Sequence, residues 1–148
     1  MKKKWTVFIL IIIAVGIGFY FLLAQPKLDA NVAGTTKSKK SIVITLDNDG
    51  FRDVHIKNVY VNDNQKPDIA KLQGHGKGFV ISDTFDEKDY HFFDYRTTPI
   101  PPLKKNKDGL DSINSGYALS LHHKTVVHSV NITYTYLGKT FYQALTID

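Results

Sequence analysis

Three histidines in the last third of the chain are the residues best suited to bind a metal ion. His122, His123 and His128 lie close together in the sequence. If the chain turns between them, the imidazoles of His122 and His128 approach each other across two strands. Neutral imidazole is a good ligand for copper and zinc. A histidine-based metal site is therefore one candidate. The alternative is that the three histidines are surface residues beside a turn.

A cluster of aromatic side chains provides the second candidate site. Tyr90, Phe92, Phe93 and Tyr95 occupy one short segment. Because side chains along a strand alternate between its two faces, they cannot all point into the core. Exposed aromatic rings anchor protein partners or stack on sugars. We expect Phe92, Phe93 and Tyr95 to contact a partner; the alternative is that one set enters the core and the proline-rich segment 99–103 covers the other.

The sequence lacks the motifs of the common catalytic centres. The chain has no cysteine, which excludes disulfides, thiolate metal sites and cysteine nucleophiles. It contains no G-x-S-x-G elbow of a serine hydrolase. The acidic segments 47–50 and 83–89 offer oxygen ligands, but the first lacks the distal glutamate of an EF-hand loop. We expect no catalytic activity and no cofactor.

The distribution of charge argues against a nucleic-acid partner. The formal net charge is +5, and Lys2, Lys3 and Lys4 supply three of these charges. Without these three lysines, 16 basic residues face 14 acidic residues, and the two signs are interleaved. A nucleic-acid-binding domain concentrates unopposed cations on one face. We therefore expect no binding to nucleic acid.

An uncharged run near the N-terminus determines the expected location. Residues 5–24 contain no charged side chain, and a helix of this length spans ~30 Å, the thickness of a bilayer's hydrocarbon core. The lysines of residues 1–4 should stay in the cytoplasm, which places the rest of the chain outside. A cleaved signal peptide begins in the same way, but Leu22 and Pro26 fit its cleavage site poorly. We expect a single-pass anchor in the cell membrane.

The segment that follows the anchor looks like a connection. Residues 25–40 are rich in small and polar side chains and show no periodicity, so they are expected to form a tether. From residue 41 onward the hydrophobic pattern has a period of two. The phase changes by one residue between Ile56 and Val59, which indicates a β-bulge. Residues 41–148 are therefore expected to form one extracytoplasmic domain.

The soluble part is predicted to be all-β. Tyr117, Leu119 and Leu121 form one apolar stripe, and residues 130–136 alternate between apolar and polar side chains up to a tight turn at 137–139. Further strand candidates are residues 42–46, 54–61, 78–82, 90–95 and 141–147. Short strands of this kind predict a small antiparallel β-sandwich preceded by one transmembrane helix.

This strand pattern resembles that of immunoglobulin-like and fibronectin type III-like modules over residues 41–148. The resemblance implies architecture only, because the Cys…Trp…Cys signature is missing and the single tryptophan, Trp5, lies in the apolar run. Together these features predict a membrane-anchored binding or accessory module that contacts an envelope protein or a wall polymer. The alternative is a histidine-based metal-binding envelope protein.

Overall fold

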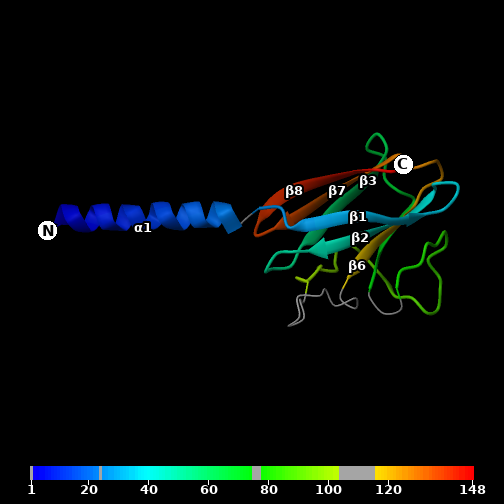
Figure 1. Cartoon of the computed structure of the whole chain (residues 1–148), viewed down its shortest axis with the longest axis horizontal. Coiled ribbons are helices and arrows are strands. Elements are labelled where there is room, and N and C mark those ends of the chain that lie inside the picture. The colour runs from blue at the N-terminus through cyan, green and yellow to red at the C-terminus, as the bar shows by residue number, and fades with distance from the viewer. Residues whose placement is uncertain (1, 24, 75–77, 104–115) are drawn as a thin grey trace.

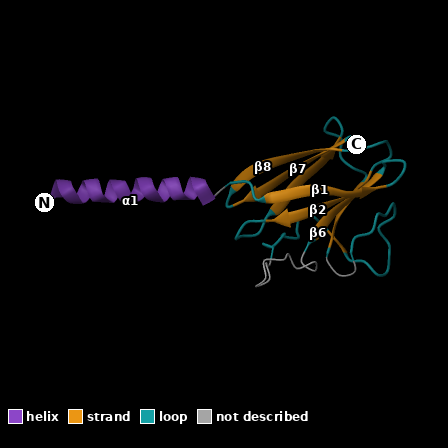
Figure 2. Ribbon diagram, viewed as in Figure 1, coloured by secondary structure: helices purple, strands orange, loops and turns teal. Residues whose placement is uncertain are grey.

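The chain consists of one N-terminal helix and a β-sandwich (Figures 1 and 2). A computed structural model describes residues 2–23, 25–74, 78–103 and 116–148. The described elements are α1 (Lys2–Leu23), β1 (Leu28–Thr35), β2 (Ser41–Asn48), β3 (His55–Val61), β4 (Ile69–Gln73), β5 (Phe92–Phe93), β6 (Tyr117–His122), β7 (Ser129–Tyr136) and β8 (Lys139–Thr146). The prediction of an antiparallel β-sandwich preceded by one apolar helix is confirmed.

The strands form two antiparallel sheets. The five-stranded sheet has the order β1-β2-β6-β4-β5, and the three-stranded sheet has the order β3-β7-β8. β1 lies close to β8 at one side of the sandwich. The two sheets pack face to face, and each directs its apolar side chains into the space between them.

Strict alternation along β7 builds one wall of this core. Val130, Ile132, Tyr134 and Tyr136 are buried, whereas the residues between them are partly exposed. The opposite wall comes mainly from β2 and β6 of the five-stranded sheet. Its fully buried side chains are Ile42, Ile44, Leu46, Leu119 and Leu121. Each such side chain contributes about 1.5–3 kcal/mol through removal from water, which makes this interface the main source of stability.

The predicted bulge and the predicted hairpin are both present. The register of β3 against β7 shifts between Ile56 and Asn58, so Lys57 is the extra residue of the bulge. β7 and β8 pair without a register shift from Ser129↔Thr146 to Tyr136↔Lys139. Their two-residue turn has positive φ at Leu137 (49°) and Gly138 (76°), as the right-handed twist of a tight hairpin requires.

The expected tether is in part a strand. Within residues 25–40, Leu28–Thr35 forms β1 and pairs with β2, with Leu28 and Ala30 buried. A register shift between Val32 and Gly34 breaks the alternation, which conceals the strand in the sequence. The folded domain therefore begins at Leu28. The lysines expected in a tail are part of α1, which starts at Lys2, and Met1 and Ala24 lie outside the described residues.

The middle of the chain departs most from the predicted strands. β4 was not expected, and only two residues of the predicted strand 90–95 pair, as β5 with Leu72 and Gln73. Residues 78–82, expected as a strand, are not strand in the structure. Residues 97–103 form a loop with one isolated β-bridge, from Ile100 to Val54, and residues 104–115 lie outside the described part.

Residues 79–85 cover the outer face of the five-stranded sheet. The buried Gln73 side chain accepts a hydrogen bond from Val80 N (2.9 Å) and donates to Ser120 Oγ. A Cβ on Gly34 would lie 3.0 Å from Ile81 Cδ1, so the absence of a side chain there lets the segment pack closely. This cover explains why Val43, Ala118 and Ser120 are buried on the sheet's outer side.

Helix α1 projects from the sandwich along its long direction (Figure 1). Its residues Lys4–Leu23 are apolar enough to cross a membrane, and none of this span is buried; a signal sequence near the N-terminus has the same properties. The helix end contacts the β7–β8 turn, where the Tyr20 hydroxyl donates to Leu137 O (3.0 Å). Lys139 Nζ lies 4.1 Å from the centre of the Phe21 ring.

The buried Tyr134 gives a testable prediction about pH. Burial raises the pKa of Tyr134, an effect that the backbone of Leu28 partly offsets. Its hydroxyl has no hydrogen-bond partner of good geometry in the described part of the chain. The protonated ring therefore stabilises the fold below the ordinary tyrosine pKa of about 10, and this contribution is lost as the pH rises through the folded-state pKa.

We expect Tyr134→Phe to leave the free energy of unfolding at neutral pH unchanged or to raise it by about 1 kcal/mol. Above pH ~10 the variant should lose less stability than the wild type. Urea unfolding of the full chain in detergent, followed by near-UV circular dichroism, measures both effects. If both proteins lost the same stability at alkaline pH, the loss would not come from Tyr134.

Candidate functional site

The three histidines of the predicted metal site do not meet in a hairpin. His122 ends β6 in the five-stranded sheet, whereas His128 precedes β7 in the three-stranded sheet. The connection from β6 to β7 therefore crosses between the two sheets. No group of three or more His, Asp or Glu side chains suited to a metal ion is found among the described residues. The hairpin on which the metal hypothesis depended is absent.

Each of the first two histidines is held by other side chains. His122 Nδ1 lies 2.7 Å from Ser41 Oγ and 3.4 Å from Asp83 Oδ1. His123 is buried, with Nε2 3.1 Å from Gln65 Oε1. Its Nδ1 is 3.3 Å from Asp68 Oδ2, but the geometry is too poor for a hydrogen bond. These contacts tie the loops that carry Asp83 and Gln65 to the end of β6.

The contact among Ser41, His122 and Asp83 brings the three residue types of a hydrolytic triad together. Its geometry differs from a triad, because the serine and the aspartate both contact the same nitrogen, His122 Nδ1. In a triad the base bonds the nucleophile and the carboxylate through different nitrogens. Ser41 is also fully buried and donates to Asp83. This arrangement fastens the loop at Asp83 to the sheet and cannot present a nucleophile to a substrate.

The predicted aromatic site is divided between core and surface. Tyr95 is only 8% exposed and belongs to the core, contrary to the expected exposed position. Phe92 is half-buried and packs edge-on against Phe85, with ring centres 5.3 Å apart. Phe93 is 42% exposed and lies over Gly74, where a Cβ would approach its ring to 2.7 Å. The three side chains therefore do not form a single surface.

A groove that sequence analysis did not find opens beside Tyr95. It has a volume of about 220 Å³ and lies between β3 and β4, at the side where the edges of the two sheets meet. β5 pairs only with Leu72 and Gln73, so the beginning of β4 forms an open edge. Asn58 and Tyr60 of β3 form one wall, and Ala70 and Lys71 of β4 form the other.

The groove carries charges of both signs. Its cations are Lys66, Lys71 and Arg96, and its carboxylates are Asp68 and Asp94. The Arg96 guanidinium lies over the Tyr95 ring at 5.4 Å, and its Nε donates to the Tyr95 hydroxyl (3.2 Å). This hydrogen bond raises the pKa of Arg96. The buried Tyr95 therefore positions the exposed Arg96 at the mouth of the groove.

The groove is suited to polar recognition. Arginine and lysine bind carboxylates, and the aspartates accept hydrogen bonds from amides and ammonium groups. No signal in the sequence could have found this site, because its residues come from three separated segments, 58–60, 66–71 and 94–96. We refer to the residues Tyr60, Lys66, Asp68, Lys71, Asp94 and Arg96 as the charged groove.

Comparison with known proteins adds no relative: the sequence matches no family model, and no curated protein and no solved structure matches it. The function of this chain is therefore inferred from its own geometry.

The separation of the histidines gives a direct test. Because His128 does not lie on a strand paired with that of His122, we expect His128→Ala to leave the affinity for Zn(II) unchanged. Isothermal titration calorimetry of the wild type, His128→Ala and His122→Ala with Zn(II) measures this. A loss of Zn(II) affinity in both variants would support the three-histidine site.

Proposed function

We propose that this protein is a membrane-anchored, extracytoplasmic binding module without catalytic activity, and that it binds an envelope protein through the charged groove. The observation that carries this proposal is the attachment of a bare apolar helix to the end of a folded sandwich. A helix of this composition with no buried surface is stable when lipid surrounds it.

The contacts at the helix end support retention of the anchor. Residues 24–27 alone separate α1 from β1, and Tyr20 and Phe21 touch the β7–β8 turn through Leu137 and Lys139. Removal of the helix as a signal peptide would break these contacts. The three lysines at the start of α1 favour a cytoplasmic N-terminus. The sandwich then lies directly against the extracytoplasmic surface of the cell membrane.

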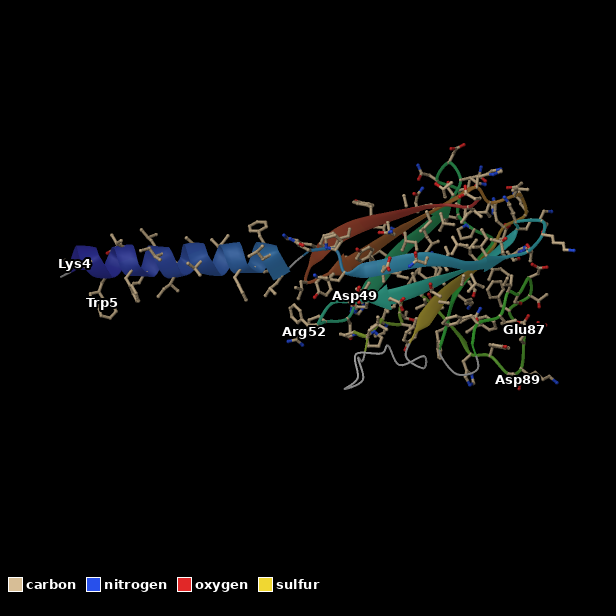
Figure 3. The ribbon with its side chains drawn as sticks, in the orientation of Figure 1. Lys4, Trp5, Asp49, Arg52, Glu87 and Asp89 are labelled. Carbon is tan, nitrogen blue, oxygen red and sulfur yellow. The ribbon has the colours of Figure 1, made fainter. Side chains whose placement is uncertain are left out.

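This arrangement directs the groove away from the bilayer. β7 ends at the turn that contacts α1, and β3 runs antiparallel to β7, so β3 leads away from the helix. Lys66 and Asp68 follow β3 and therefore lie toward the far end. Figure 3 supports this polarity, with Arg52 near the helix and Glu87 and Asp89 distant from it. A partner in the envelope can reach the groove without meeting lipid.

Mixed charge in the groove favours a protein segment as the partner. An anionic polymer would be repelled by Asp68 and Asp94, whereas a polypeptide can place acidic and basic side chains opposite complementary groups. Such complementarity governs specificity and the rate of association more than total affinity. The groove thus suits an accessory module that associates with a neighbouring envelope protein.

The proposed topology can be tested with single cysteines, since the chain has none. In intact cells a membrane-impermeant maleimide should label Ser38→Cys, at the end of the sandwich distant from α1, and should label Lys2→Cys only after lysis. Both variants should migrate at the full-length mass. Labelling of Lys2→Cys in intact cells would reverse the topology, and loss of the first ~25 residues would establish cleavage.

The groove can be tested by photo-crosslinking in cells. A photoreactive amino acid at Lys71 should capture a specific protein, whereas the same group at the exposed Lys37, in the β1–β2 turn, should not. Adding Arg96→Ala should lower the yield at Lys71 by about fivefold to tenfold, because an arginine at an interface centre contributes on that scale. The matched control for Arg96→Ala is Lys37→Ala, which removes an exposed cation outside the groove and should leave the yield at Lys71 unchanged. Equal yields with and without Arg96 would exclude the groove as the contact.

A further inference from the structure

The outer faces of the two sheets differ in how they are covered. The five-stranded sheet lies beneath residues 79–85, which bury its outer side chains. The three-stranded sheet has no such cover in the described part of the chain. Its outward residues form three rows across β3, β7 and β8, which we call the open face. The rows are His55–Thr135–Thr140, Asn58–Thr133–Tyr142 and Tyr60–Asn131–Ala144.

The chemistry of the open face is unusual for this chain. None of the nine positions is Asp, Glu, Lys or Arg, although 22% of the chain is charged and about two charges would be expected. Lys57, the bulge residue, adjoins the face without belonging to a row. Apart from one alanine, every position has a hydroxyl, amide, imidazole or phenol group. The face is therefore neutral and rich in hydrogen-bonding groups.

Nearly all of these side-chain groups are without a hydrogen-bond partner in the described part of the chain. Among the described residues, the only side-chain hydrogen bond from the nine positions is from Thr135 Oγ1 to His55 O, at 3.5 Å. The side chains of Asn131 and Thr133 are partly exposed beside one another on β7, and Asn58 is exposed opposite Thr133. Hydroxyls and amides of this kind can donate to and accept from a ligand at once.

Tyr142 is the prominent feature of the open face. It is 79% exposed, the largest exposed fraction among the large hydrophobic residues of the described chain. Tyr60 lies across the sheet and one row away, on the order of 10 Å distant by the spacing of strands. Two phenol rings at this separation can stack on different rings of one extended ligand. Tyrosine presents a flat apolar surface together with a polar tip.

We propose that the open face binds an uncharged polysaccharide, with Tyr142 stacking on a sugar ring. None of the nine positions supplies a lysine or arginine to hold a polyanion such as a nucleic acid. It also lacks the aliphatic centre of a protein interface, where charged residues are depleted but apolar ones abound. A sugar chain requires aromatic surface for its C–H groups and hydroxyl or amide partners for its O–H groups, and these are the groups present.

This proposal adds a second ligand to the proposed function, and the open face adjoins the charged groove at Tyr60, which belongs to both. β8 runs from Lys139, at the helix end, toward the far end of the sandwich. The open face therefore stands along the side of the domain, where a wall polymer close to the membrane can lie across it. Glycan bound at Tyr142, on the strand of this sheet most distant from the groove, leaves the groove's charged side chains accessible to a protein.

The experiment measures retention of full-length protein, in phosphatidylcholine nanodiscs, on three uncharged polysaccharides: chitin, amorphous cellulose and crosslinked dextran. We expect retention on at least one, and Tyr142→Ala should weaken it by about fivefold to tenfold. Tyr142→Phe should retain most of the binding. Phe51→Ala is the matched control, because Phe51 is also exposed (53%) but lies outside the rows. High salt should leave retention unchanged.

Other outcomes would overturn the inference. No retention of the wild type on any of the three polysaccharides would do so, as would equal retention of the wild type and Tyr142→Ala. Competition by dextran sulfate together with salt sensitivity would indicate a polyanion site instead. If Tyr142→Ala abolished self-association in sedimentation experiments, the face would be an interface between two copies. The cysteine-labelling and crosslinking results are independent of all these outcomes.

Discussion

The fold depends on one constraint, which is that the apolar side of β7 must be buried against the five-stranded sheet. Val130, Ile132, Tyr134 and Tyr136 point to one side of β7 and are each at most 1% exposed. Because a strand alternates with a period of two, burying these four residues turns Asn131, Thr133 and Thr135 outward. The composition of the open face is thus fixed by the same alternation that builds the core.

The edge strands of the two sheets differ in how well they resist pairing with other chains. β1 and β3 both carry bulges, and β5 pairs through two residues only, features that discourage pairing with other chains. β8 has eight residues without a bulge, and Lys139 at its start is its one charged residue. Tyr142 lies on this edge strand, with its side chain exposed. An extended polymer can therefore approach the open face from the side of β8.

Polar contacts decide where the connecting segments lie. Gln73 holds Val80, and Ser41 with His122 holds Asp83, so residues 79–85 are fixed over the five-stranded sheet. In the described part of the chain, no segment covers the outer face of the three-stranded sheet. His122 and His123, two of the residues predicted to bind metal, contact side chains from distant segments, Asp83 and Gln65 respectively. Tyr95, which was predicted to contact a partner, is a core residue, and its hydroxyl orients Arg96. In each case the residue is placed by partners distant in sequence.

Features that depend on residues close in sequence could be predicted from the chain alone. The apolar run of α1, the alternation of β2 and β7, the bulge near Lys57 and the hairpin turn at Gly138 all follow from local periodicity and local conformation. The other features depend on contacts between segments that are distant in the chain. β1 is hidden by its bulge at Gly34, and β4 lacks alternation because Gln73 is buried through hydrogen bonds to distant groups. The charged groove unites segments that only the packing of two sheets brings together, and sequence spacing cannot report such a contact.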